Sequence, residues 1–213
     1  MDILIVVIAG FGLLIFLTTD AFKVWGHRLW RRRRIRFVEA YGWPPELLQS
    51  ITQAYPHLNQ EQCILAGNAL KQFFIGYLLS WQEPLTMPSR VTDELWHAFI
   101  VRTKDYAAFC NESFGEFFHH TPDVAMPPNW RSENERMRNI WRSCCNIEGI
   151  DPINPGRLPL LFAIDDLLQI EDGNSYLLYC ELLECTEYMP VPPGPKRWRN
   201  SGGGCGGGCG GGD

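Results

Sequence analysis

The sequence predicts a mainly α-helical protein with a single N-terminal transmembrane helix, a compact all-α domain and a disordered glycine- and cysteine-rich tail. An uncharged apolar run near the N-terminus, apolar residues at helical spacing through the middle and glycine concentrated at the C-terminus predict this fold class. The chain has 213 residues, 46% of them hydrophobic and 20% charged, so we expect one domain with its own core. The 13% of aromatic residues exclude a largely disordered chain.

Residues 1–25 are predicted to form a membrane anchor. Residues 3–18 read ILIVVIAGFGLLIFLT without a charge, and at about 1.5 Å per residue they cover roughly 24 Å of the bilayer core. Trp25 suits the membrane interface, so a tilted span is expected. A cleaved signal peptide is the alternative, but Asp2 stands where positive charge is needed and no small-residue cleavage pattern follows.

A basic juxtamembrane segment is predicted over residues 26–42. Seven Lys and Arg side chains lie within residues 23–36, and the positive-inside rule then places the N-terminus outside and the C-terminal domain in the cytoplasm. Nucleic-acid binding is the alternative for this run, but residues 37–213 carry 12 basic and 22 acidic side chains, which argues against it. The residues predicted to contact anionic lipid headgroups are Arg31, Arg32, Arg33 and Arg34.

Helix caps and apolar spacing predict a helical domain over residues 43–189. Pro45 suits the first turn of a helix that Pro56 ends, and Asn59 is a suitable cap for the longest helix, over residues 60–81. A helix over DELWHAFIV, capped by Ser89 or Thr92, and another over KDYAAFCNESF, from Thr103 to Gly115, are expected next.

The last third of this domain is predicted to hold two further helices. RSENERMRNIWRSCCNIEG is amphipathic, and PLLFAIDDLLQI is an apolar helix on which Asp165 and Asp166 form a surface pair. SYLLYCELLECTEY fits either a helix or a short hairpin strand. Residues 190–213 are Pro-rich and then Gly/Cys-rich, so we expect a flexible tail.

The chain contains eight cysteines, and a cytoplasmic location favours buried thiols or metal ligands over disulfides. Cys205 and Cys209 lie in the glycine-rich tail and could capture a metal or pair with each other, but contacting nothing specific is the preferred interpretation, since a structural zinc site normally needs four ligands.

Three of the five histidines lie between residues 93 and 120. On a helix, Asp93 and Glu94 flank His97, where either could act as a co-ligand, a partner that fixes the imidazole tautomer, or a general base. They are the candidate catalytic residues.

A candidate metal site follows if the next helix folds back on the first. Cys110 and one of His119 and His120 would then approach His97, giving nitrogen, sulfur and oxygen ligands suited to zinc or a similar divalent ion. Adjacent histidines on an extended segment point to opposite sides, so only one of the pair is expected to face the site. The alternative is structural: a polar cluster at His97, a buried Cys110 thiol and a histidine pair that holds a turn.

The stretch VTDELWHAFIVRTKDYAAFCNESFGEFFHHTP resembles the signature of the glycine-rich domain-containing protein-like (GRDP-like) family, whose bacterial, plant and fungal members have no agreed reaction. LPLLFAIDDLL and the glycine-rich tail resemble further parts of that family. The resemblance implies a helical GRDP-like domain of uncharacterised role. It is carried by Asp93, Glu94, Trp96, His97, Thr103, Tyr106, Phe109, Cys110, Phe114, Gly115, His119 and His120.

These observations together predict a membrane-tethered binding or scaffolding protein of the GRDP-like type with an unidentified protein partner. A metal-dependent, hydrolase-like enzyme at the membrane surface is the alternative. Under it the histidine and cysteine cluster would hold the ion and leave one coordination position for water.

Overall fold

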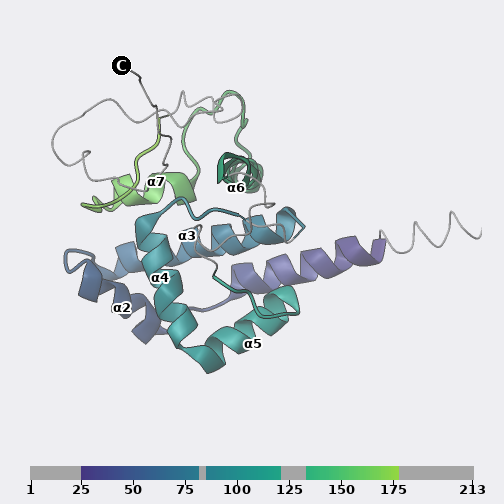
Figure 1. Cartoon of the computed structure of the whole chain (residues 1–213), viewed down its shortest axis with the longest axis horizontal. Helices are drawn as coiled ribbons and strands as arrows, with labels where there is room; N and C mark the ends of the chain where they lie inside the picture. Colours follow the sequence, from purple (N-terminus) through teal and green to yellow (C-terminus); the bar gives the residue numbers. More distant parts are fainter. Residues whose placement is uncertain (1–24, 82–84, 121–132, 178–213) are drawn as a thin grey trace, which may run out of the picture.

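The computed structural model describes residues 25–81, 85–120 and 133–177, and within these ranges every regular element is a helix (Figure 1). The predicted mainly α-helical class is therefore confirmed for this part of the chain. The segment left open between helix and strand lies almost entirely outside the described residues, as does the tail. A helix over residues 25–40 is followed by α2 (Pro45–Ala54), α3 (Gln60–Leu79), α4 (Arg90–Val101), α5 (Thr103–Phe114), α6 (Glu133–Glu148) and α7 (Leu160–Leu167).

The predicted membrane anchor requires correction. Among the described residues, no helix is both long and apolar enough to cross a bilayer. The helix nearest the predicted anchor, over residues 25–40, has arginine at six of its sixteen positions, and burying those charges in hydrocarbon would be costly. This finding overturns the prediction of a single-pass membrane protein with a transmembrane helix and a cytoplasmic domain. The apolar run at residues 3–18 itself lies outside the described residues.

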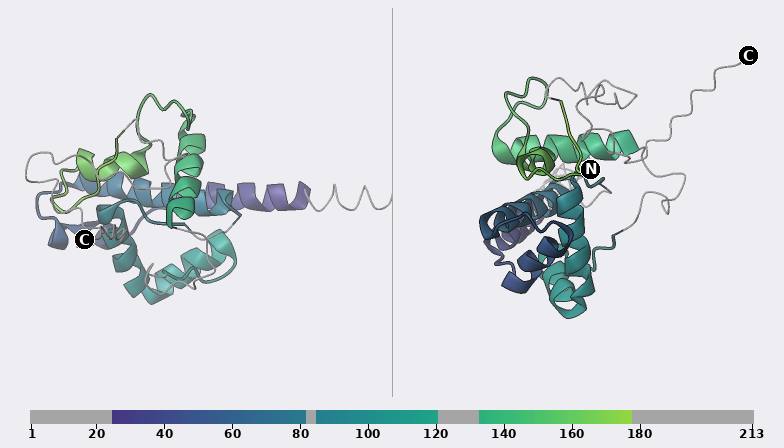
Figure 2. Two further views of the ribbon diagram at one scale, coloured as in Figure 1. Left: turned by 45° about the horizontal axis from the view of Figure 1, so that its top comes forward. Right: turned by 90° about the vertical axis from the view of Figure 1, so that its left-hand side faces the viewer.

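Helix α3 runs through the centre of the domain and contacts α2, α4, α6 and α7. Figures 1 and 2 show α6 and α7 on one side of α3, with α2, α4 and α5 on the other. The helix is apolar on nearly all sides, as a buried helix must be. It begins at the predicted cap, because Asn59 and Gln62 form a capping box in which each side chain accepts the other's backbone N–H at 2.9 Å.

The helix over residues 25–40 belongs to the folded domain, although its sequence suggested only a juxtamembrane segment. Val38 is fully buried, and the Phe37 ring lies 6.0 Å from that of Phe109 on α5. The Lys71 side chain of α3 donates to the Glu39 carbonyl. Arginine has high helix propensity, so a run of arginines continues a helix readily once one face can pack.

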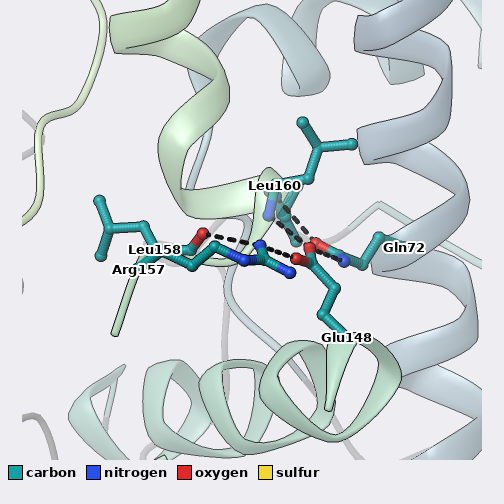
Figure 3. Close-up of polar contacts among 6 residues, drawn as sticks. Gln72, Glu148, Arg157, Leu158 and Leu160 are labelled. Atoms are coloured by element: carbon teal, nitrogen blue, oxygen red, sulfur yellow. Dashed lines mark hydrogen bonds and ion pairs between the residues drawn. The ribbon is translucent and has the colours of Figure 1, made fainter. Parts of the chain in front are cut away.

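Two side chains from neighbouring helices satisfy the first backbone N–H groups of α7 (Figure 3). Glu148 accepts from the Leu160 N–H at 2.6 Å, and the Gln72 carbonyl oxygen accepts from the Leu161 N–H at 2.8 Å. The Gln72 amide donates to Glu148 at 2.7 Å, and Arg157 forms an ion pair with the same carboxylate. Because the N-terminal N–H groups of a helix have no partner within it, this network fixes where α7 begins.

Replacing Glu148 by glutamine is expected to lower the free energy of unfolding by about 1–2 kcal/mol, because its hydrogen bonds lose their charge. Burial alone would raise the pKa of Glu148, but the hydrogen bonds from Leu160, Gln72 and Arg157 lower it below its ordinary 4.5. The folded chain therefore holds this proton less tightly than the unfolded chain. The stabilisation is present above pH 4.5 and is lost as pH falls through the lower folded value.

Urea unfolding of the wild type and of Glu148→Gln, followed at neutral pH and below pH 4.5, measures this difference. The difference in free energy of unfolding between the two proteins should become smaller as the pH is lowered. Glu171→Gln, at an exposed position, is the matched control and should follow the wild type. A difference in free energy of unfolding that stays constant with pH would contradict the role given to the Glu148 carboxylate.

Candidate functional site

The start of α4 is fixed by a carboxylate from another helix. Asp165 of α7 accepts hydrogen bonds from the Ser89 hydroxyl at 2.7 Å and from the backbone N–H groups of Arg90 at 2.8 Å and Val91 at 3.2 Å. It also accepts the Asn174 N–H at 2.9 Å. Burial raises the pKa of Asp165, and these donors act in the opposite direction. The predicted surface pair is thus wrong for Asp165, which is only 2% exposed.

The chain after α5 returns toward α4. Gly115 closes α5 in the left-handed conformation, with φ of 81°, which glycine adopts without steric cost. Residues 115–120, which we call the strap, then run without regular secondary structure to His120. The His120 ring lies 4.5 Å from the Trp96 ring and 4.4 Å from the His97 ring, both on α4.

Asp93, His97 and His120 form one compact cluster. The carboxylate of Asp93 contacts both imidazoles, with one oxygen 3.0 Å from His120 Nε2 and the other 3.6 Å from His97 Nδ1. One candidate ligand atom from each residue lies within 4.8 Å of the other two. The pairing of Asp93 with His97 follows from their spacing of one helical turn, whereas His120 arrives from 27 residues along the chain.

This geometry is compatible with a bound divalent ion. Zinc bonds of about 2.0–2.1 Å at tetrahedral angles place neighbouring ligand atoms roughly 3.3–3.4 Å apart. The three candidate ligand atoms already lie within 4.8 Å of one another, so small side-chain movements would bring them to that spacing. The His97 side chain is 48% exposed and that of His120 21% exposed, so the cluster opens toward solvent on the His97 side. Three protein ligands would leave a tetrahedral ion one further position.

The other residues predicted for the site lie elsewhere. Cys110 is completely buried, and burial raises the pKa of its thiol, which disfavours the thiolate form that binds metals. His119 is exposed with its ring 4.8 Å from that of Phe117. Glu94 is also exposed. The group that could hold an ion, among the described residues, contains none of these three.

The predicted lipid-contacting arginines divide into two pairs. Arg31 lies 4.3 Å from the centre of the Trp81 ring, and Arg34 lies 3.8 Å from that of Trp30. Arg32 and Arg33 are exposed. Contact of these side chains with lipid headgroups stays a prediction.

The described cysteines Cys63, Cys110, Cys144 and Cys145 are all free and buried. Burial raises the pKa of each thiol, as in Cys144. They therefore belong to the core. Cys205 and Cys209 lie outside the described residues.

A family model described as UCP032817-like matches residues 33–191, which include all three residues of the cluster. The chain belongs to the UCP032817-like family. The GRDP-like resemblance is therefore wrong: it rested mainly on one stretch around α4 and α5, whereas the UCP032817-like match extends from the helix over residues 25–40 to beyond α7. No curated protein and no solved structure matches this UCP032817-like chain.

Proposed function

We propose that this UCP032817-like protein is a binding module that holds one divalent transition-metal ion through Asp93, His97 and His120. The convergence of one carboxylate and two imidazoles within 4.8 Å is the observation that carries the proposal. Imidazole nitrogen suits zinc, copper, iron and nickel, and a carboxylate oxygen completes a set typical of zinc or iron(II).

The scaffold around these three residues supports the proposal. Asp93 and His97 lie on α4, whose first turn is fixed by the buried Asp165. The His120 ring packs against Trp96, which is itself buried. Ligands held on a rigid helix and against a buried ring lose little conformational entropy when an ion binds.

Cobalt(II) titration of the full chain, followed by visible absorption and by elemental analysis after dialysis, tests this function. We expect one ion per chain with nitrogen and oxygen ligands. His97→Ala and His120→Ala should each weaken binding by at least about tenfold, because each removes a direct ligand. His119→Ala is the matched control, since it removes the adjacent exposed imidazole, and should bind like the wild type.

Two outcomes would contradict the proposal. One is the absence of stoichiometric binding to the wild-type chain. The other is a spectrum dominated by thiolate ligands that survives both alanine substitutions, which would assign the ion to cysteines instead.

Metal-dependent hydrolysis at the same cluster is a second candidate function. The half-exposed His97 favours it, because an ion bound there would keep a coordination position open to water. Zinc-dependent cleavage of a simple aryl ester by the wild type, lost in His120→Ala and retained in His119→Ala, would support this function. If the chain binds the metal but does not cleave the ester, the hydrolase function fails and the metal-binding module remains the proposed function.

A further inference from the structure

His120 is the one member of the cluster that no helix positions. It ends the strap, residues 115–120, which has no backbone ladder of its own. Among the residues that the structure describes, its distance of 3.0 Å from Asp93 is set by contacts that the strap makes with the rest of the domain. These contacts converge on Phe118, two residues before His120.

The Phe118 ring packs against several aromatic rings of the core. It stacks on Tyr77 at 4.1 Å with an angle of 18°, and on Trp96 at 5.2 Å with an angle of 27°. It also meets the rings of Phe74 and Phe114 edge-on, at 6.1 and 5.2 Å. These contacts hold the side chain of Phe118, but they do not orient its backbone. A directional contact is needed to fix its position along the site.

The backbone of Phe118 has that directional contact. The Tyr106 hydroxyl donates to the Phe118 carbonyl at 2.5 Å and accepts the Trp96 indole N–H at 3.1 Å. Tyr106 is fully buried, so water does not compete for these bonds.

We infer that Tyr106 is a positioning residue for the metal ligand His120, acting through the carbonyl of Phe118. This inference rests on the proposed metal site. It also gives Tyr106, an α5 residue of the sequence motif, a role other than ligation: Tyr106 holds the strap, and the strap presents His120 to Asp93.

Tyr106→Phe keeps the ring and removes only the hydroxyl. Outer partners that orient metal ligands typically change affinity by about 10–100-fold when they are removed, so we expect cobalt(II) affinity to fall by about tenfold or more. Tyr77→Phe is the matched control. It also removes a hydroxyl from a tyrosine that contacts Phe118, but it keeps the stacking of the two rings. It should therefore leave the cobalt(II) affinity unchanged.

A double-mutant cycle separates positioning from a general loss of stability. If Tyr106 acts through His120, Tyr106→Phe should have no further effect on cobalt(II) affinity in a His120→Ala chain. An equal loss of affinity in both backgrounds would overturn the inference, because the hydroxyl would then act on the fold as a whole.

A readout without metal distinguishes this inference from the proposed function. In the wild type, nuclear Overhauser contacts are expected between the His120 ring and the Trp96 and His97 rings, which lie within 4.5 Å. Tyr106→Phe should weaken them and Tyr77→Phe should not. If the wild type binds no metal but these contacts weaken, the proposed function fails and positioning of His120 stands. Unchanged contacts in Tyr106→Phe would overturn the positioning role.

Discussion

Replacing Asp165 by alanine is expected to lower the free energy of unfolding by about 3–5 kcal/mol, the range seen when one partner of a buried charged network is removed. The substitution leaves three backbone N–H groups, of Arg90, Val91 and Asn174, without their acceptor. The Ser89 hydroxyl loses Asp165 but keeps the Thr92 hydroxyl as an acceptor at 2.9 Å. Each buried donor without a partner costs about 1–3 kcal/mol before relaxation. The first turn of α4 should therefore loosen.

Asparagine at the same position should recover only part of this loss. Its amide offers one acceptor oxygen, whereas both oxygens of Asp165 accept N–H groups in the native fold. The NH₂ group of the asparagine would point at N–H groups that need an acceptor, such as those of Arg90 and Asn174. Asp166→Ala is the matched control, because Asp166 is exposed and its carboxylate bonds only the Ser175 hydroxyl among the described residues. Urea unfolding followed by tryptophan fluorescence measures all three variants. Equal losses for Asp165→Ala and Asp166→Ala would contradict the role of Asp165.

Trp141→Ala is expected to destabilise the domain by a similar amount, about 3–5 kcal/mol, through the cavity that a buried indole leaves. Trp141 lies on α6 and is 2% exposed. Its ring packs edge-to-face on Phe162 of α7 at 5.0 Å, and its N–H donates to the Pro152 carbonyl at 3.1 Å. The substitution removes the largest side chain between α6 and α7.

Trp81→Ala supplies the comparison, because Trp81 is 64% exposed. Its contact with Arg31 is worth about 0.5–1 kcal/mol at such a site, so the loss should not exceed that. Thermal unfolding monitored by circular dichroism distinguishes the two variants. A loss below about 1 kcal/mol for Trp141→Ala would show that α6 and α7 are held together by other contacts.

The parts of the fold that obey local rules were predictable from sequence. Asn59 caps α3, Ser89 caps α4 and Gly115 ends α5, each through backbone groups within a few residues. The helix over residues 25–40 was missed because its arginines follow an apolar run, and that order is typical of a membrane boundary. Its packing against α5 involves residues about 70 positions away.

The candidate site was predictable to the same extent. The pairing of Asp93 with His97 follows from helical spacing, and the expectation that only one of His119 and His120 faces α4 agrees with the positions of the two rings. Which histidine faces α4 depends on how Phe118 is held, and that is set by Tyr106 and Trp96. The prediction of Cys110 as a metal ligand is wrong in direction, because helical spacing alone does not show which side of α5 faces the core. Cys110 lies on the core side and is fully buried.

The central position of α3 has a consequence for how the domain melts. Since α2 and α4 pack on α3 and so do α6 and α7, the unwinding of α3 would remove a packing surface from both groups at once. The described helices should therefore unfold in one cooperative transition rather than as two separable halves. His97 and Asp93, though carried near the surface, then share the slow hydrogen exchange of the core beneath them.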